Sequence, residues 1–161
     1  MDDRADDIPR LALDWHRAGR GAALATVVET WGSAPRPVGS QLVIDRDGAM
    51  EGSVSGGCVE GAVIVEAIDA LEDGGSRLLD YGVSDDEAFA VGLACGGRIR
   101  VHVDTVGGTL PEAVLAQLVE ARDARKAIGL SVDLDGAARE LIGPDAAPER
   151  FRLDRSGIEP D

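Results

Sequence analysis

Two cysteines, each beside a pair of glycines, are the residues of this sequence best suited to chemistry. The chain reads GSVSGGCVEGAV from Gly52 to Val63 and GLACGGRIRV from Gly92 to Val101, which places Cys58 and Cys95 in glycine-rich stretches. Glycine lets the backbone approach a ligand without a Cβ in the way. If the two stretches meet in space, they form a pocket with thiols at its lining and glycines at its walls.

Cys58 lies where a helix is expected to begin. The first N–H groups of a helix have no partner within it, and the macrodipole adds about half a positive charge at that end. Such an end can hold phosphate or another anion, and it favours a thiolate over a thiol. Glu60, in the same first turn, either opposes that shift or reaches back as a capping carboxylate, with Ser55 or Gly57 at the cap.

Two arginines near the glycine-rich stretches are candidates for holding an anion. Arg36 lies in the proline-containing stretch GSAPRPVGS, and Arg98 follows the second glycine pair. The guanidinium group presents a planar fork of donors that matches phosphate. A structural interpretation stays open for each candidate, because free cysteines are commonly buried for packing alone and single arginines are commonly solvated on the surface.

Several familiar kinds of site are not predicted. His16 and His102 show no ligand-like spacing to the cysteines, which argues against a structural zinc site, and His102 is expected to be a partly exposed strand residue. The cysteines do not form the C-x-x-C redox pattern. A Walker motif is absent, and no G-x-G-x-x-G follows a predicted strand, so a dinucleotide site is not supported.

The composition is that of an acidic globular domain. Of 161 residues, 44% are hydrophobic and 29% charged, and the formal net charge is −14. This charge opposes binding to nucleic acids and to anionic membranes, which depends on Lys and Arg. The start MDDRADDIPR lacks the apolar core of a signal peptide, and the sequence contains no apolar run long enough for a membrane span. We therefore expect a cytoplasmic protein with reduced cysteines, no nucleic-acid partner and no membrane span.

Helices and strands that could position these residues follow from the apolar spacing. The pattern predicts helices at 8–18, 58–73 and 111–125, strands at 22–31, 41–45, 76–82 and 98–104, a turn at 45–48, and a hairpin formed by 127–133 and 138–142. The segment 22–31 is apolar nearly throughout, which predicts a central strand covered on both faces. The segment 98–104 alternates, which predicts one buried face formed by Ile99, Val101 and Val103.

Together these elements predict an α/β fold. We expect a single domain at 1–143 with a mixed β-sheet covered by helices, followed by a polar C-terminal tail or truncated linker at 144–161. The order of the strands does not follow from the sequence.

Three blocks of the sequence, GSAPRPVGSQLVI, GSVSGGCVEGAV and GLACGGRIRV, resemble in order and spacing the XdhC/CoxI family, accessory proteins of molybdenum hydroxylases. The resemblance is close from Ala22 to Asp104 and looser after Pro111. It implies an accessory chaperone, rather than an enzyme, that binds the molybdenum cofactor (molybdopterin). Such a chaperone assists sulfuration of the cofactor with a cysteine desulfurase and inserts it into the apo-enzyme of a molybdenum hydroxylase, of xanthine dehydrogenase or carbon monoxide dehydrogenase type.

The resemblance also implies which residues form the cofactor site. Cys58 and Cys95 are the thiol candidates, and Cys95 is the one expected to contact the metal, since a soft thiolate suits molybdenum and sulfur. The other residues implied in cofactor binding are Ser55, Gly56, Gly57, Gly96, Gly97 and Arg36. Longer family members append a Rossmann-like domain, and we expect no appended Rossmann-like domain here. A homodimer would be compatible with this interpretation.

Two other classes of function stay open from the residues alone. A thiol enzyme would use Cys58 or Cys95 as a nucleophile and would need a base within hydrogen-bond reach, usually a histidine. Neither His16 nor His102 lies near the cysteines in sequence. A non-catalytic protein-interaction domain would instead bury both cysteines and use the glycines for turns.

Overall fold

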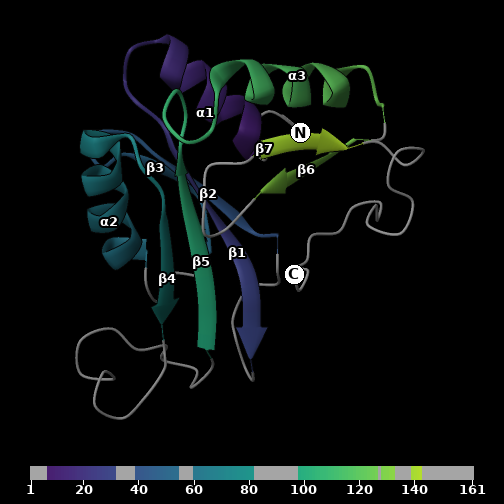
Figure 1. Cartoon of the computed structure of the whole chain (residues 1–161). Coiled ribbons are helices and arrows are strands. Elements are labelled where there is room, and N and C mark those ends of the chain that lie inside the picture. The colour runs from purple at the N-terminus through teal and green to yellow at the C-terminus, as the bar shows by residue number, and fades with distance from the viewer. Residues whose placement is uncertain are drawn as a thin grey trace.

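The computed structural model describes residues 7–31, 39–54, 60–81, 98–126, 128–132 and 139–142. Over these ranges the chain forms a five-stranded sheet with one helix on one face and two helices and a small hairpin on the other (Figure 1). The predicted tail at 144–161 lies outside the described residues. In the described part of the chain, no helix is both long and apolar enough to cross a membrane.

The sheet places the most apolar strand at its centre. Its strands are β1 (Ala23–Trp31), β2 (Gln41–Ile44), β3 (Met50–Gly52), β4 (Arg77–Tyr81) and β5 (Arg98–Thr105). Their order is β3-β2-β1-β5-β4, so that β1 is the middle strand, as its sequence predicts. The sequence does not predict β3, because this strand has only three residues, all of them exposed, and therefore no apolar alternation.

Strand direction differs from the predicted mixed sheet, since every pairing within the five-stranded sheet is antiparallel. The strands β1, β2 and β3 follow one another along the chain, and each reverses direction. Helix α2 (Glu60–Asp73) then carries the chain from β3 at one edge to β4 at the opposite edge. The two strands that α2 joins point the same way but never become neighbours. The α/β domain with a sheet covered by helices is confirmed.

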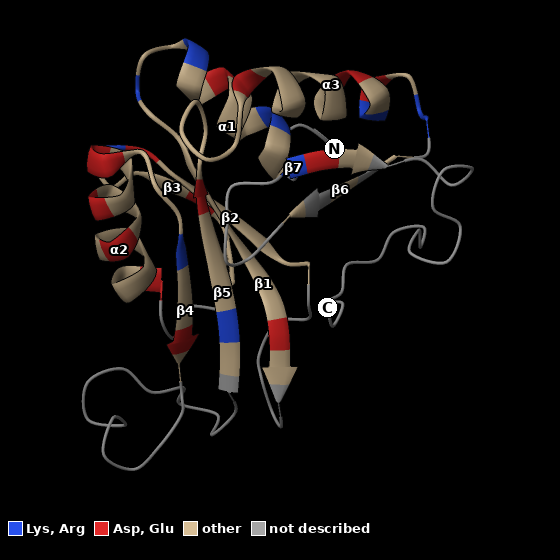
Figure 2. Cartoon of the chain, viewed as in Figure 1, with Lys and Arg blue, Asp and Glu red and all other residues tan. Residues whose placement is uncertain are grey.

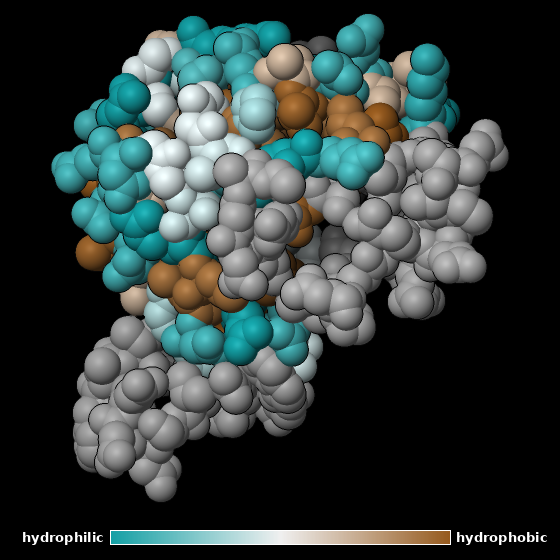
Figure 3. All heavy atoms as spheres, in the orientation of Figure 1, coloured by the Kyte–Doolittle hydropathy of each residue, from teal (hydrophilic) through white to brown (hydrophobic). Residues whose placement is uncertain are grey.

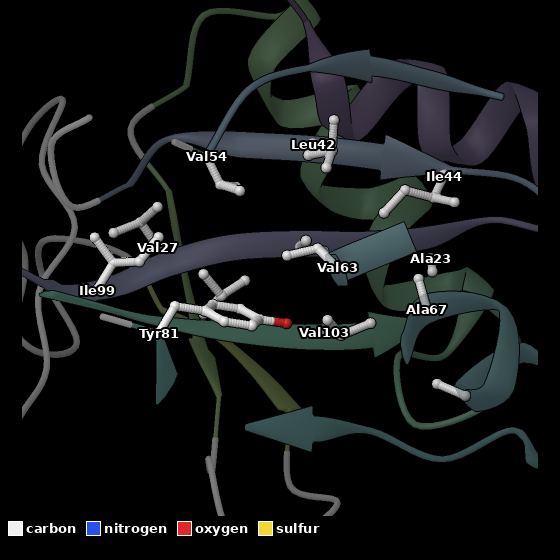
Figure 4. Close-up of a cluster of buried hydrophobic side chains, with 13 residues drawn as sticks. Ala23, Val27, Leu42, Ile44, Val54, Val63, Ala67, Tyr81, Ile99 and Val103 are labelled. Atoms are coloured by element: carbon white, nitrogen blue, oxygen red, sulfur yellow. The ribbon is translucent and has the colours of Figure 1, made fainter. Parts of the chain in front are cut away.

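One face of the sheet is covered by α2. The side chains of Val63, Ala67 and Ala70 are fully buried, and the helix contacts four of the five strands. Figure 4 shows Val63 and Ala67 directed at the apolar side chains of the strands. The strand residues of this core are Ala23, Ala25, Val27, Leu42, Ile44, Tyr81, Ile99, Val101 and Val103.

The other face is covered by α1 (Ile8–Arg17), α3 (Glu112–Asp123) and the hairpin of β6 (Gly129–Val132) with β7 (Arg139–Ile142). The predicted helices and the predicted hairpin are thus confirmed within the described residues. Asp7 caps α1 by accepting a hydrogen bond from the N–H of Arg10. The core on this face contains Ile8, Ala12, Leu13, Ala22, Leu24, Val43, Val106, Leu110, Leu115 and Val119.

Strand β5 has a second buried face that the sequence does not predict. His102 and Asp104, expected on an open face, are each 4% exposed. Strand β7 lies against this part of the sheet, and its Arg139 donates hydrogen bonds to Asp104. The prediction of a partly exposed His102 is therefore wrong, because packing of a hairpin distant in sequence decides which strand faces are covered.

Candidate functional site

The predicted cofactor residues lie outside the described residues. They are Arg36, Ser55, Gly56, Gly57, Cys58, Cys95, Gly96 and Gly97. The structure describes the residues that flank them. These are the strand ends and the helix start that come directly before and after the undescribed parts of the three blocks. The roles of these residues as thiol, metal and phosphate ligands stay predictions.

The first and third blocks are anchored on adjacent strands at one end of the sheet. The segment 32–38 follows Trp31, the last residue of β1, and the segment 82–97 joins Tyr81 of β4 to Arg98 of β5. Trp31 pairs with Arg98, and Tyr81 pairs with Ile99. The arginine block and the Cys95 block therefore leave the sheet from neighbouring positions.

The second block is anchored at the same end. Its segment 55–59 follows Val54, which is fully buried in one cluster with Val27 and Ile99, as Figure 4 shows. Val27 is the middle residue of β1, and Ile99 is the second residue of β5, next to the position from which the Cys95 block leaves. The structure thus brings together the anchor points of all three glycine-containing blocks, although the blocks are distant in sequence.

Glu60 links the two ends of the segment that carries Cys58. It is the first residue of α2, it is 5% exposed, and its Oε2 accepts hydrogen bonds from Ser53 Oγ at 2.7 Å and from Val54 N–H at 3.0 Å. Of the two roles predicted for Glu60, the structure has it reaching back along the chain. The hydrogen bond to Ser53 spans seven positions rather than the three of a capping box, so no sequence signal identifies Ser53 as its partner.

A row of charged residues crosses the sheet near these anchor points. Arg100 of β5 stands directly opposite Glu29 of β1 and Asp80 of β4. Its Nη1 lies 2.8 Å from Glu29 Oε1, and its Nε lies 3.4 Å from Asp80 Oδ1. Figure 2 shows this basic position on β5 between acidic positions on its two neighbours. Arg100 is therefore engaged with carboxylates of the sheet.

Tyr81, the last residue of β4, carries a buried hydroxyl, which Figure 4 shows directed away from this end of the sheet and toward Val103. Its side chain packs under α2, and within the described part of the chain its Oη has no hydrogen-bond partner. Burial, assisted by the nearby charge of Glu66, raises the pKa of Tyr81 to about 12. The phenol therefore stays neutral at physiological pH.

Neither histidine is found beside these anchor points. His16 lies near the opposite end of the sheet, with its Nε2 at 3.5 Å from Glu112 Oε2 and its ring close to Gly107. His102 is buried on the face covered by α1 and α3, where burial lowers its pKa. Among the residues described, no group of three His, Cys, Asp or Glu side chains could hold a metal ion.

A surface pocket lies outside the three blocks, between α1 and β3. Its lining residues are Leu11, Trp15, Arg20, Ala49, Met50 and Glu51. The guanidinium of Arg20 stacks on the Trp15 ring at 3.9 Å from its centroid and pairs with Asp45 at 2.8 Å. On the face drawn in Figure 3, hydrophobic residues form small islands between hydrophilic ones.

Comparison with known families identifies the region that holds the first two blocks. Residues 15–82 match the model of the XdhC and CoxI family. This match runs from α1 to the end of β4 and contains the arginine block and the Cys58 block.

Proteins from three bacteria are similar to this chain. The molybdenum cofactor insertion chaperone PaoD of Escherichia coli (strain K12) is 37% identical over 126 residues, which are 78% of this chain and 38% of PaoD. A probable xanthine dehydrogenase subunit of Bacillus subtilis (strain 168) is 39% identical over 88 residues, or 53% of this chain and 26% of that protein. The crystal structure of a xanthine dehydrogenase from Bacillus halodurans superposes with a TM-score of 0.62 at 25% identity, covering 75% of this chain and 36% of that one.

The chain spans well under half the length of each of these relatives. The family match at residues 15–82 nevertheless covers β1 to β4 and α2, and with them the anchor points at Trp31, Val54, Glu60 and Tyr81. Through this matched region, the chain belongs to the XdhC and CoxI family.

Proposed function

We propose that this chain binds the molybdenum cofactor and takes part in its insertion into a molybdenum hydroxylase. One structural observation carries the proposal: the anchor points of the three glycine-containing blocks lie together at one end of the sheet. The cofactor is inferred from the similarity to PaoD, which is named as a molybdenum cofactor insertion chaperone. We also propose that a cysteine desulfurase donates sulfur to the bound cofactor. The cofactor then passes to the target hydroxylase, and the chain acts in the cytoplasm.

The donor types in the three blocks fit the two ends of this cofactor, a dithiolene that binds molybdenum and an anionic phosphate or nucleotide. Thiolates are soft ligands suited to molybdenum and sulfur. Backbone N–H groups beside glycines and an arginine fork suit phosphate. Because Arg100 is engaged by Glu29 and Asp80, we assign the phosphate end to Arg36 and Arg98.

Within this proposal, Cys95 contacts the metal and Cys58 provides a second thiol. The residues assigned to the phosphate end with the arginines are Ser55, Gly56, Gly57, Gly96 and Gly97. When bound, the cofactor supplies the oxidation–reduction chemistry of the hydroxylase that receives it. The chain itself would bind and orient the cofactor for transfer, without turnover of its own.

The test is binding of molybdenum cofactor by the purified full chain, with wild type compared with Cys58→Ala and Cys95→Ala. Circular dichroism verifies that each variant is folded, and Glu72→Ala, an exposed change on α2, serves as a matched control. We expect the wild type and Glu72→Ala to bind equally and Cys95→Ala to bind at least about tenfold more weakly, a loss of about 1.4 kcal/mol.

Two results would overturn parts of this proposal. A folded wild-type chain that does not retain the cofactor would show that the chain does not bind it alone. If the folded cysteine variants bind the cofactor as tightly as wild type, neither thiol belongs to the site, although the chain still binds the cofactor.

A further inference from the structure

We infer that Glu60 is a positioning residue for the cofactor site: its carboxylate ties the start of α2 to Ser53 and Val54 and so fixes the two ends of the segment 55–59, which carries Cys58. This inference rests on the proposed function for its consequence in cofactor binding. The contacts themselves lie entirely among described residues.

The geometry is that of a clamp built on one oxygen atom. Ser53 Oγ donates to Glu60 Oε2 at 2.7 Å, and Val54 N–H donates to the same oxygen at 3.0 Å. Val54 is fully buried and Glu60 is 5% exposed, so the hydrogen bond between them is shielded from water, whereas the bond from the half-buried Ser53 is shielded only in part. A buried carboxylate is costly unless it is hydrogen-bonded, and hydrogen bonds to a charged acceptor are stronger than neutral ones.

The position of Glu60 on its helix adds a second stabilising effect. A negative charge in the first turn interacts favourably with the positive end of the helix macrodipole. The same charge stands two positions after Cys58 in the sequence and would disfavour a thiolate there. The hydrogen bonds of Glu60 would thus position Cys58, whereas its charge would disfavour the thiolate form. Substitutions can separate these two effects.

Fixing the ends of this segment matters because its sequence is permissive. The sequence has Gly56 and Gly57 here, and holding glycines in one backbone conformation costs more conformational entropy than holding other residues. A contact that fixes the ends beforehand reduces this cost and so increases affinity. Glu60 would thus act on cofactor binding without touching the cofactor.

Three substitutions separate the effects. Glu60→Gln keeps an acceptor oxygen and removes the charge, Glu60→Ala removes both, and Ser53→Ala removes one donor and keeps the charge. Because Glu60→Gln and Glu60→Ala both lack the charge, the difference between them reports the loss of the side chain beyond Cβ, with its hydrogen bonds and packing, and not the loss of the charge. Glu72→Ala, exposed on the same helix, is the control.

The first readout needs no cofactor. In a Cys95→Ala background Cys58 is the only thiol of the chain, so its alkylation by iodoacetamide can be followed across pH. We expect the profiles of Glu60→Gln and Glu60→Ala to differ, because only Glu60→Gln keeps an acceptor for Ser53 and Val54. Identical profiles for the two Glu60 variants would overturn the inference. If Glu60→Ala does not fold, Ser53→Ala is compared with wild type in the same way.

The second readout is retention of molybdenum cofactor by the full chain with both cysteines present. We expect about tenfold weaker binding for Glu60→Ala, rescue to within about threefold of wild type by Glu60→Gln, and no change for Glu72→Ala. Equal binding by folded Glu60→Ala and wild type would contradict a positioning role in cofactor binding. If no variant binds cofactor, including wild type, the proposed function fails, whereas the alkylation profiles still decide whether Glu60 positions Cys58.

Discussion

Arg139 of β7 and Asp104 of β5 form a buried, two-pronged ion pair. Arg139 Nε donates to Asp104 Oδ2 at 2.7 Å and its Nη2 donates to Oδ1 at 3.0 Å. The two side chains are 1% and 5% exposed, and Thr109 Oγ1 also donates to Asp104 Oδ1. The pair connects the hairpin β6–β7 to the central sheet, although its two residues are far apart in the sequence.

Breaking this pair on one side should strongly destabilise the fold. Arg139→Met leaves the Asp104 carboxylate buried without its cation, and loss of one partner of a buried ion pair typically costs about 3–5 kcal/mol. The free energy of unfolding in urea measures the loss. Asp73→Asn, which breaks the exposed pair of Asp73 with Arg77, is the control and should cost much less. Equal losses in the two variants would show that burial of the Asp104–Arg139 pair is not what matters.

His102 should make the protein less stable in mild acid. Burial lowers the pKa of His102 below 6.5; the charge of Asp104 opposes this, and that of Arg139 adds to it. The unfolded chain therefore takes up a proton near pH 6.5, whereas the folded chain does so only at lower pH. The stability that the neutral histidine contributes is fully present above pH 6.5 and is lost as the pH falls from there toward the folded-state pKa.

Urea unfolding of wild type and of His102→Gln, repeated from pH 7.5 to pH 5, measures this loss. On lowering the pH, wild type should lose more free energy of unfolding than His102→Gln. A difference between the two proteins that does not change with pH would contradict the assignment. The comparison with the variant removes the contribution of carboxylates such as Asp45, which both proteins share.

Tyr81→Phe should stabilise the protein. The Tyr81 hydroxyl is buried, and in the described part of the structure its Oη has no hydrogen-bond partner. Removing an unsatisfied buried polar group removes its desolvation cost, so we expect a gain of about 1 kcal/mol in the free energy of unfolding. A loss of stability in Tyr81→Phe would mean that the hydroxyl is satisfied in solution.

Ionisation of Tyr81 should make the protein less stable in alkali. The pKa of Tyr81 is about 12 when folded and 10.0 for an ordinary tyrosine. Because the folded-state value is raised, the stability linked to the neutral phenol is present below pH 10 and is lost as the pH rises toward 12. Tyr81 is the only tyrosine of the chain, so tyrosinate absorbance follows it directly. A midpoint near 10 in the folded protein would rule out the buried environment.

Gly52 and Gly61 should respond in opposite directions to substitution by alanine. Gly52 ends β3 with φ of +98°, and a Cβ there would lie 2.3 Å from the carbonyl oxygen of Gln41. Gly61 is exposed in α2 and a Cβ there would meet nothing within 4 Å. Gly52→Ala should lower the free energy of unfolding by more than about 1 kcal/mol, and Gly61→Ala should raise it by up to about 1 kcal/mol. Thermal unfolding of both variants checks this, and a neutral Gly52→Ala would show that β3 ends differently in solution.

The order and type of most elements could be predicted from the sequence, because apolar spacing is a local property. The alternation of β5 and the helical spacing of α1, α2 and α3 each place apolar side chains on one side of an element. The apolar run of β1 likewise predicts the central strand. β3 escaped prediction because three exposed residues carry no periodic signal.

The candidate site, too, could be predicted from the sequence only in part. Residue types and spacing alone single out Cys58, Cys95 and Arg36, and their roles stay predictions because these residues lie outside the described part of the chain. The partners of Glu60 could not be predicted, since a carboxylate that accepts hydrogen bonds from residues six and seven positions earlier matches no standard capping pattern.

Only the tertiary structure decided which strands become neighbours, that all of the sheet pairings are antiparallel, and that His102 and Asp104 are buried. It also decided that the ends of three separate blocks meet at one end of the sheet. The sequence by itself determined the elements, the acidic character of the chain and the residue types that could do chemistry. The physical reason is that periodicity records which side of an element is apolar, whereas pairing and burial depend on contacts between residues far apart in the chain.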